Sequence, residues 1–524
     1  MLRSWKSSVF VGLSFAAGLV APDAPVAFGA KGPDRLDQIA VERMPSFRET
    51  EKYQLNIAEE YYRTGKYDIA AGEYEKFITL YESSEGASYV QLKWALCQVK
   101  LKKLNTAIKD GFQTVIDYWP DSPDAVAASY LIGQTLKDMG EISQAKAAYL
   151  KTIDKHNGEM VATLARLDLA ELARIEGDRA RQMTLLKELV TTGVRKGDAA
   201  GRIHDASRTL ATMYFQDGLF PDGVASLETT WKEPELSNQV WQYLHTPLAQ
   251  LFAGPEGKDK AESKKQAETM ADAAIAYFTK NQPASPKDDA EKGVFKSQGY
   301  RIAGAHSYVG RKDQAGKVYE ALATKFGEDD VLVNYAAWLK SDNRRDDARR
   351  VYGRMKDQIQ ALSYTALSYR EENRFDQAIP IYQDLITKDT KNSNDWTYQL
   401  AYTYHLAHKW KEAIATYQQC TNFPQNLWQI GECYRQQNLH KQALGIYTQI
   451  AAGYEDQTAE AMWYIALCYE AEKKPESAIK TLQNICQKYS NGKYGGVASR
   501  AHQRLNDTYK ITFTKGGATT EAAP

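Results

Sequence analysis

Three stretches of the chain repeat one pattern and decide the fold. They read YQLAYTYHLAHKWKEAIATY (398–417), WQIGECYRQQNLHKQALGIY (428–447) and WYIALCYEAEKKPESAIKTL (463–482). Each begins with apolar and small residues at helical spacing that end in an aromatic, and each closes on an alanine followed four positions later by a large apolar residue. Because apolar residues at i, i+3, i+4 and i+7 line one face of a helix, each stretch predicts two helices joined by a short polar turn.

The same pattern recurs along most of the chain. Its clear copies are Ala70–Tyr74, Ala145–Tyr149, Ala315–Tyr319, Ala348–Tyr352, Ala378–Tyr382, Ala413–Tyr417 and Ala443–Tyr447, and weaker ones lie at Ala107 (with Phe112, displaced by one residue), Gly223 and Ala478. A single hairpin cannot bury its apolar face alone, so neighbouring hairpins must stack. The pattern resembles the tetratricopeptide repeat over most of residues 51–509. This resemblance implies an all-α, helix-hairpin solenoid of about ten to twelve hairpins.

The first residues are typical of an export signal. Arg3 and Lys6 precede an apolar run from Val9 to Val20, and small residues around Gly29 fit a cleavage site. We therefore expect export to the periplasm or the extracellular space, with an uncleaved anchor or a mispredicted start codon as the alternatives. The run is shorter than the roughly 20 residues that span a bilayer. The expected organisation is a signal peptide (1–29), a linker (30–50), an N-terminal solenoid (51–237), an irregular helical joint and loop (238–296), a C-terminal solenoid (297–509) and a disordered tail (510–524).

Two linkers carry a narrower resemblance. The sequence Tyr-Trp-Pro-Asp-Ser-Pro at 118–123, followed by Ala127-Ala128 and by Tyr130 to Gly133, resembles the link between repeats in bacterial envelope proteins. These include the Tol-associated cell-division coordinator and the tetratricopeptide lipoprotein of the outer-membrane assembly machine. Residues 489–492 with Ala498 and Ala501 form a looser second copy. The resemblance implies an envelope location and envelope assembly components as partners.

Composition and motifs argue against several classes of function. Lys plus Arg and Asp plus Glu are 66 each, so the chain lacks the net positive charge of a strongly basic nucleic-acid binder. The stretch 310–317 has one residue too many for a phosphate-binding loop and Val318 where a hydroxyl is needed. We find no catalytic motif and predict a non-enzyme without cofactor or metal. The rival hypothesis is an enzyme whose site lies in the joint.

The histidines and cysteines are candidate metal ligands or disulfide partners. His405 and His408 are three residues apart and His440 lies one repeat later, which makes a metal site conceivable, but a solvated turn explains them better. There are 5 cysteines and no CxxC motif. In an oxidising compartment Cys420–Cys433 or Cys468–Cys486 could pair, and Cys97 would stay free. The sequence leaves this pairing open.

The resemblance also implies a binding groove. In tetratricopeptide proteins the first helix of each hairpin lines the concave face, and by register this face carries four aromatic and four charged candidates. They are Tyr398, Tyr402, Trp428 and Trp463, with Arg370, Glu432, Arg435 and Glu470. Exposed rings rimmed by charges would hold a protein or peptide partner. The sequence therefore predicts an exported scaffold for envelope assembly or maintenance; a carbohydrate or cell-wall binder and rings packed inside the solenoid remain the alternatives.

Overall fold

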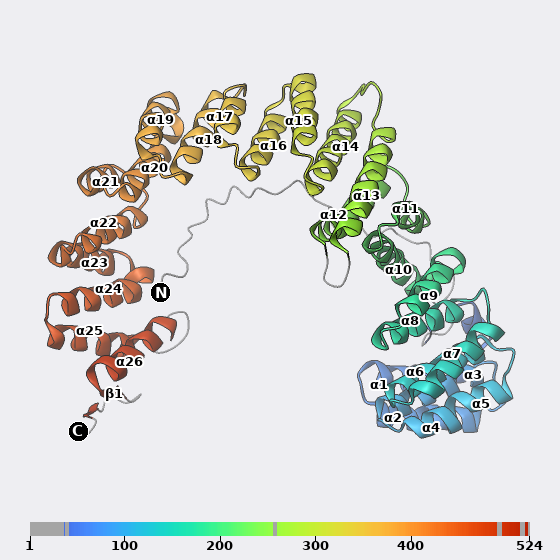
Figure 1. Cartoon of the computed structure of the whole chain (residues 1–524). Helices are drawn as coiled ribbons and strands as arrows, with labels where there is room; N and C mark the ends of the chain where they lie inside the picture. The colour runs from blue at the N-terminus through green and yellow to red at the C-terminus, as the bar shows by residue number, and fades with distance from the viewer. Residues whose placement is uncertain (1–35, 37–40, 255–258, 490–494, 514–518, 522–524) are drawn as a thin grey trace. The chain divides into compact units, whose positions relative to one another are not determined.

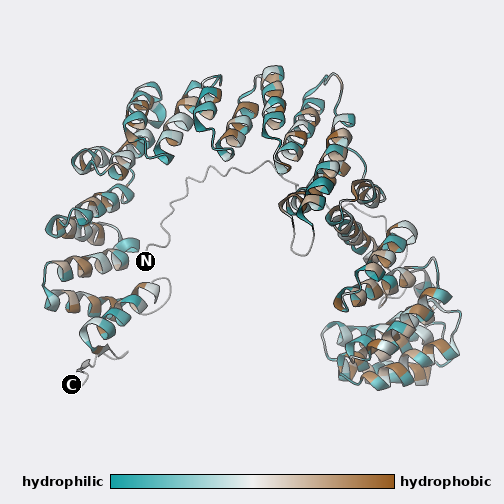
Figure 2. Ribbon diagram, in the orientation of Figure 1, coloured by the Kyte–Doolittle hydropathy of each residue, from teal (hydrophilic) through white to brown (hydrophobic). Residues whose placement is uncertain are grey.

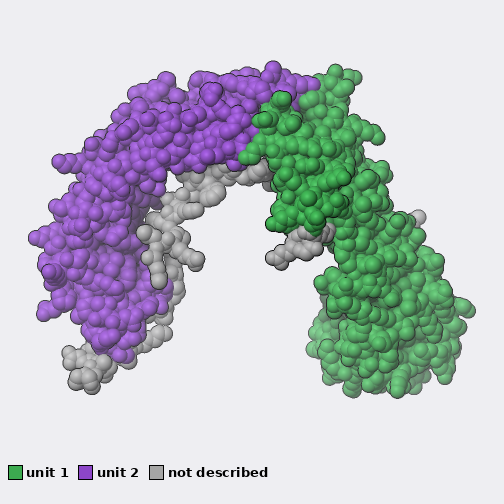
Figure 3. Space-filling model, in the orientation of Figure 1, with its two compact units in different colours: residues 1–319 green, residues 320–524 purple. Residues whose placement is uncertain are grey.

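The computed structural model describes residues 36, 41–254, 259–489, 495–513 and 519–521. Its contacts divide the chain into unit 1, Met1–Tyr319, and unit 2, Glu320–Pro524 (Figure 3). The division falls within helix α15. Both units are rows of antiparallel helix hairpins, which confirms the predicted all-α solenoid (Figure 1). None of the described helices is long and apolar enough to span a bilayer.

In unit 1 a 3-10 turn, η1 (Val41–Ser46), precedes alternating first and second helices. The first helices are α1 (Glu49–Arg63), α3 (Ala87–Lys100), α6 (Pro123–Asp138), α8 (Met160–Ile175), α10 (Gly197–Gln216), α12 (Glu235–Ala253) and α14 (Asp289–Tyr308). The second helices are α2 (Tyr67–Leu80), the combined α4 (Leu104–Thr106), η2 (Ala107–Phe112) and α5 (Gln113–Tyr118), then α7 (Ile142–Lys155), α9 (Arg179–Thr192), α11 (Phe220–Glu228), α13 (Lys260–Lys280) and α15 (Lys312–Phe326).

Unit 2 continues the alternation. Its first helices are α16 (Asp329–Ser341), α18 (Gln358–Glu371), α20 (Ser393–Leu406), α22 (Gln425–Gln436), α24 (Thr458–Ala471) and α26 (Gly495–Tyr509). Its second helices are α17 (Arg345–Tyr352), α19 (Phe375–Lys388), α21 (Trp410–Tyr417), α23 (His440–Gly453) and α25 (Pro475–Lys488), with short 3-10 turns η3 (Thr390–Asn392) and η4 (Glu455–Gln457) before α20 and α24.

The repeated alanines and aromatics form the core. Tyr74, Tyr149, Tyr417 and Tyr447 are all at most 1% exposed. Apolar residues lie mainly between neighbouring helices (Figure 2). A Cβ atom on Gly431 of α22 would lie 2.7 Å from the Tyr447 ring of α23. The small residue on the first helix is therefore what lets the aromatic of the second helix fill the crossing, as the pattern predicted.

One conformation closes the turns within the hairpins. In unit 1 it is adopted by Lys102 (φ 62°) between α3 and α4 and by five glycines at positive φ, which are Gly65, Gly140, Gly177, Gly218 and Gly310. In unit 2 the same position holds Asn343, Asn373, His408, Asn438 and Lys473, with φ between 57° and 61°. This left-handed residue ends a helix because its amide bonds back to the last turn. His408 is thus a turn residue.

Helix length explains the uneven repeat spacing. The second helices α17 and α21 have 8 residues, whereas α19, α23 and α25 have 14. Intervals that start on a short second helix are the short ones, as from Ala348 to Ala378. The displaced copy at Ala107 has a local cause as well, since residues 107–112 form a π-helical turn. Such a turn accommodates one extra residue without breaking the helix.

The expected segment boundaries differ from the observed elements at three places. The limits drawn at 237/238 and 296/297 fall inside α12 and α14, and the helices α12, α13 and α14 pack on one apolar cluster with Met270 and Phe278. The expected linker 30–50 contains η1 and the start of α1. In the expected disordered tail, β1 (Ile511–Phe513) pairs antiparallel with β2 (Thr519–Glu521). The expected signal peptide, 1–29, lies outside the described residues.

Candidate functional site

The surface formed by the first helices of unit 2, α16, α18, α20, α22, α24 and α26, is called here the first-helix strip. Figure 1 shows α16, α18 and α20 on the inner side of the curve that these hairpins follow. Contacts between successive first helices join the strip. Lys340 of α16 pairs with Glu371 of α18 at 2.8 Å, and the Arg370 guanidinium of α18 donates to the side-chain oxygen of Gln399 on α20 at 2.8 Å.

Arg370 of α18 is half-buried and lies beside the exposed Tyr402 of α20. The guanidinium carbon of Arg370 lies 5.3 Å from the centroid of the Tyr402 ring and 5.4 Å from that of Tyr382. Tyr402 is 37% exposed. Stacking on two rings and the bond to Gln399 hold the guanidinium in place, which is favourable because such cation–π contacts stabilise a partly desolvated cation. Within the described residues Arg370 forms no ion pair.

Trp428 is a core residue, and its expected place in the groove is corrected. It is 8% exposed and belongs to the apolar cluster around α21–α24. Its ring centroid lies 5.4 Å from those of Tyr447 and Tyr464. The second helix of its own hairpin and the first helix of the next one close over it, so the ring is covered from both sides.

Tyr398 and Trp463 occupy the same register position as Trp428 but are only half-buried. Tyr398 packs edge-on against Tyr417 with centroids 5.4 Å apart, and burial raises the pKa of its hydroxyl. Trp463 lies under the Arg500 guanidinium of α26, 5.1 Å from the ring centroid. Both rings are therefore partly accessible while packing against neighbouring side chains.

The remaining charged candidates are already paired. Arg435 donates to Glu432 at 2.8 and 2.6 Å, and this bond raises the pKa of Arg435. Glu470 accepts from Arg504 at 2.6 Å and from the Tyr509 hydroxyl at 3.1 Å. Because these groups already form ion pairs within the chain, they attract the charges of a partner less strongly than Arg370 does.

Arg349 of α17, which the sequence pattern did not indicate, packs against residues at the C-terminal end of α18. It is 8% exposed, bonds to Ser368 at 2.8 Å and to Glu372 at 2.5 Å, and stacks 4.2 Å from the Tyr369 ring centroid. Its carboxylate partner Glu372 has a lowered pKa because of the hydrogen bond from Arg349. The sequence does place Arg349 before a tyrosine-rich helix, but only the structure shows that the arginine is buried against that helix.

The histidines and cysteines form no ligand set. No group of three or more His, Cys, Asp or Glu residues suited to a metal occurs in the described ranges. All five cysteines are free and buried, so neither of the two pairings left open by the sequence is formed. The Cys433 sulfur lies 3.5 Å from Nδ1 of His405. Burial raises the pKa of Cys433 to about 12 and lowers the pKa of His405, which keeps both groups neutral.

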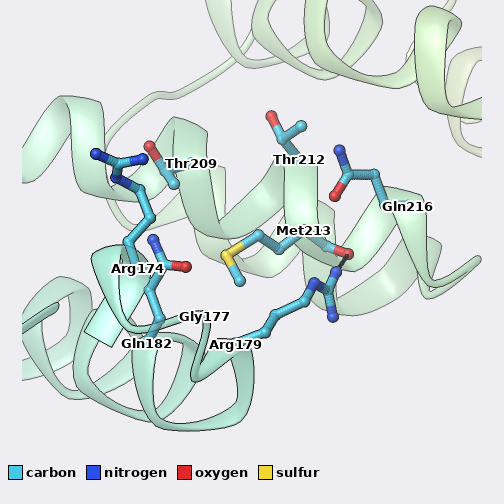
Figure 4. A pocket seen from close by; sticks show the side chains of 8 residues that line it. All are labelled: Arg174, Gly177, Arg179, Gln182, Thr209, Thr212, Met213 and Gln216. Atoms are coloured by element: carbon cyan, nitrogen blue, oxygen red, sulfur yellow. Dashed lines mark hydrogen bonds between the residues drawn. The ribbon is translucent and has the colours of Figure 1, made fainter. Parts of the chain in front are cut away.

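A cavity of about 400 Å³ lies in unit 1, between the α8–α9 turn and α10 (Figure 4). Arg174, Arg179 and Met213 are among its lining residues. Arg174 pairs with Glu171 at 2.7 Å, and Arg179 pairs with Asp217 at 2.7 Å and donates to the Met213 carbonyl at 2.9 Å. Because both arginines are engaged within the chain, the first-helix strip is the stronger candidate.

Comparison with known proteins supports the repeats. Residues 89–122 and 460–492 match one family model described as tetratricopeptide repeat, and residues 365–426 match another with the same description. Both matches to the first model reach the linkers at 118–123 and 489–492. Pro120 lies between α5 and α6 and Pro123 is the first residue of α6, where the Ser122 side chain accepts from the Ala125 amide at 3.1 Å. Residues 490–494 lie outside the described ones.

Two solved structures are also similar to the chain. One is described as the crystal structure of the APC/C hetero-tetramer Cut9-Hcn1, with 13% identity, coverage of 89% of this chain and 100% of that chain, and a TM-score of 0.27. The other is yeast Tom70, with 11% identity, coverage of 88% and 97%, and a TM-score of 0.25. Curated proteins gave no match. The family models and the observed hairpins together identify tetratricopeptide repeats in this chain.

Proposed function

Because the chain carries tetratricopeptide repeats, we propose that it is a non-catalytic scaffold that binds a protein or peptide partner on the first-helix strip of unit 2. The observation that carries the proposal is the pair Arg370 and Tyr402. Among the described residues the Arg370 guanidinium has no carboxylate partner, and it lies beside the exposed Tyr402 ring. Such a pair suits a partner that places a carboxylate on the guanidinium and an apolar group against the ring.

The same pair favours a peptide over a sugar. A sugar ring would stack on an open aromatic face. The Arg370 guanidinium lies over the Tyr402 ring, while Trp428 is buried and Trp463 lies under Arg500. The faces that a carbohydrate would need are thus partly occupied, whereas a carboxylate gains from the same guanidinium.

The place of action is part of the proposal. The signal-like residues 1–29 and the two envelope-type linkers support a role after export, in assembly or maintenance of the cell envelope. Mass spectrometry of the mature N-terminus tests this directly. Loss of residues 1–29 is expected, and an intact N-terminus in the cytosol would refute the export step.

Capture from solubilised envelope tests the binding site. Arg370→Ala and Tyr402→Ala are compared with Arg350→Ala, whose side chain is 78% exposed on the second helix α17. Truncation at a binding hot spot typically reduces affinity by about 2 kcal/mol or more, roughly thirtyfold. Proteins captured by the wild type should be lost with both strip variants and kept with Arg350→Ala. Unchanged capture by both strip variants would refute the site, and retention of a polysaccharide in a parallel assay would favour the carbohydrate alternative.

A further inference from the structure

A short segment ahead of α1 is held by side chains far away in the sequence. This N-terminal arm, residues 43–47, contacts α3 and α6 through Arg43. The guanidinium donates to Oδ2 of Asp124 at 2.7 Å, to the carbonyl of Glu85 at 2.7 Å and to the Ser88 hydroxyl at 3.2 Å. Three acceptors around one planar cation match the donor geometry of a guanidinium and not that of a compact ammonium.

The acceptor side is built into the solenoid. Asp124 lies in the first turn of α6 and is 6% exposed, and Ser88, 3% exposed on α3, donates to it at 2.6 Å. A buried carboxylate is strongly destabilising unless a cation and hydrogen bonds compensate for the lost water. Among the described residues the cation paired with Asp124 is Arg43, which the arm supplies.

A second contact of the arm, made by Phe47, adjoins the guanidinium site. Phe47 is 4% exposed and packs on the apolar cluster of α1, α2 and α3. A Cβ atom on Gly86 would lie 2.7 Å from its ring, so the ring fits there only because residue 86 is glycine. Residues 85–88 thus border both contacts: the Glu85 carbonyl and the Ser88 hydroxyl accept from the Arg43 guanidinium, and Gly86 leaves space for the Phe47 ring.

We propose that the amino-terminal ends of α3 and α6 form a recognition site for an arginine-bearing peptide, and that Arg43 is its resident ligand. Asp124 and Ser88 belong to packed helices and Glu85 to the turn before α3, whereas the arm supplies its arginine from outside the hairpins. A short tether keeps such a ligand at an effective concentration in the millimolar range, so it occupies the site even when its intrinsic affinity is weak. An arginine of a partner protein, presented at sufficient concentration, replaces it.

This site lies in unit 1 and does not depend on the function proposed for the first-helix strip. The two can therefore fail separately, because the variants that test one leave the residues of the other unchanged.

The test uses the full chain and a labelled, end-capped peptide of residues 41–45, Val-Glu-Arg-Met-Pro. In the Arg43→Ala chain the guanidinium site is open, so the peptide should bind at least tenfold more tightly than to the wild type, where Arg43 competes. Adding Asp124→Asn should weaken this binding at least tenfold, and so should replacing the peptide's arginine by lysine. Fluorescence anisotropy measures all four combinations.

Methylguanidinium provides a second readout. It should raise the thermal unfolding midpoint of the Arg43→Ala chain more than methylammonium does, and it should have no such effect on the chain that also carries Asp124→Asn. Should Asp124→Asn impair folding, Ser88→Ala removes one acceptor and should weaken peptide binding in the same direction. Peptide binding that is absent from the Arg43→Ala chain, or equal with and without Asp124, would overturn the proposal and leave the arm as a structural cap only.

Discussion

The crossing of α22 and α23 offers a direct test of how the hairpins pack. A Cβ atom added at Gly431 would lie 2.7 and 2.8 Å from two atoms of the Tyr447 ring, closer than such contacts occur. Tyr447 is 1% exposed, so its ring cannot move away from an added methyl group without displacing its neighbours. Overpacking of this kind destabilises by about 1–3 kcal/mol. Alanine in place of helical glycine returns about 0.5–1 kcal/mol, so Gly431→Ala should lose roughly 1–2 kcal/mol net.

The matched control lies two residues from the same tyrosine. Gly445 is on the exposed face of α23, and a Cβ atom there meets nothing within 4 Å. Gly445→Ala should therefore stabilise by about 0.5–1 kcal/mol through helix propensity alone. The two identical substitutions are thus expected to act with opposite sign and to differ by roughly 2 kcal/mol, close to thirtyfold in the local unfolding constant.

Native-state hydrogen exchange of the α22 and α23 amides measures this locally, which suits a solenoid whose repeats need not unfold together. Faster exchange is expected for Gly431→Ala and slower exchange for Gly445→Ala. Trimming the ring in the double variant Gly431→Ala/Tyr447→Leu should show coupling, with a smaller loss than the two single changes sum to. If Gly431→Ala is as stable as Gly445→Ala, the ring does not fill the crossing and the packing argument fails.

Three further outcomes are expected. Trp428→Ala should lower the stability of the surrounding hairpins by about 3–5 kcal/mol, because it leaves a cavity at a buried site. Tyr402→Ala should change the stability by less than about 1 kcal/mol. Urea unfolding compares the two variants, and similar losses would contradict the burial of Trp428. Burial lowers the pKa of His405, so the unfolded chain takes up the proton first as the pH falls. The free energy of unfolding should therefore fall below about pH 6.5, by at most about 1.4 kcal/mol per pH unit. If His405→Gln leaves the pH dependence of the unfolding midpoint unchanged, another group causes it. Burial raises the pKa of Cys97 to about 12 and of Cys420 to about 11. A thiol reagent at pH 8 should therefore react with the folded chain far more slowly than with the chain in urea. Prompt reaction of the folded chain would show that these cysteines are accessible.

The sequence by itself determined the fold, because the hairpin is specified locally. Apolar spacing sets each helix, and a small residue opposite an aromatic sets each crossing, as at Gly431 and Tyr447. The turn position was readable wherever glycine marks it, but Asn373 and His408 adopt the same left-handed conformation, which only the backbone reveals. The uneven repeat spacing was visible as numbers, yet its cause, the short helices α17 and α21, was not.

The binding surface was decided by tertiary structure. Tyr398, Trp428 and Trp463 share one register position, so the sequence treated them alike, but the cover that the next hairpin provides differs and buries Trp428 alone. Pairing of charges is likewise long-range: Glu470 meets Arg504 on α26, whereas Arg370 meets two rings and an amide. The seat of Arg43 joins residues 81 positions apart. Local periodicity cannot report such contacts, because they depend on which helices the stacking of hairpins brings together.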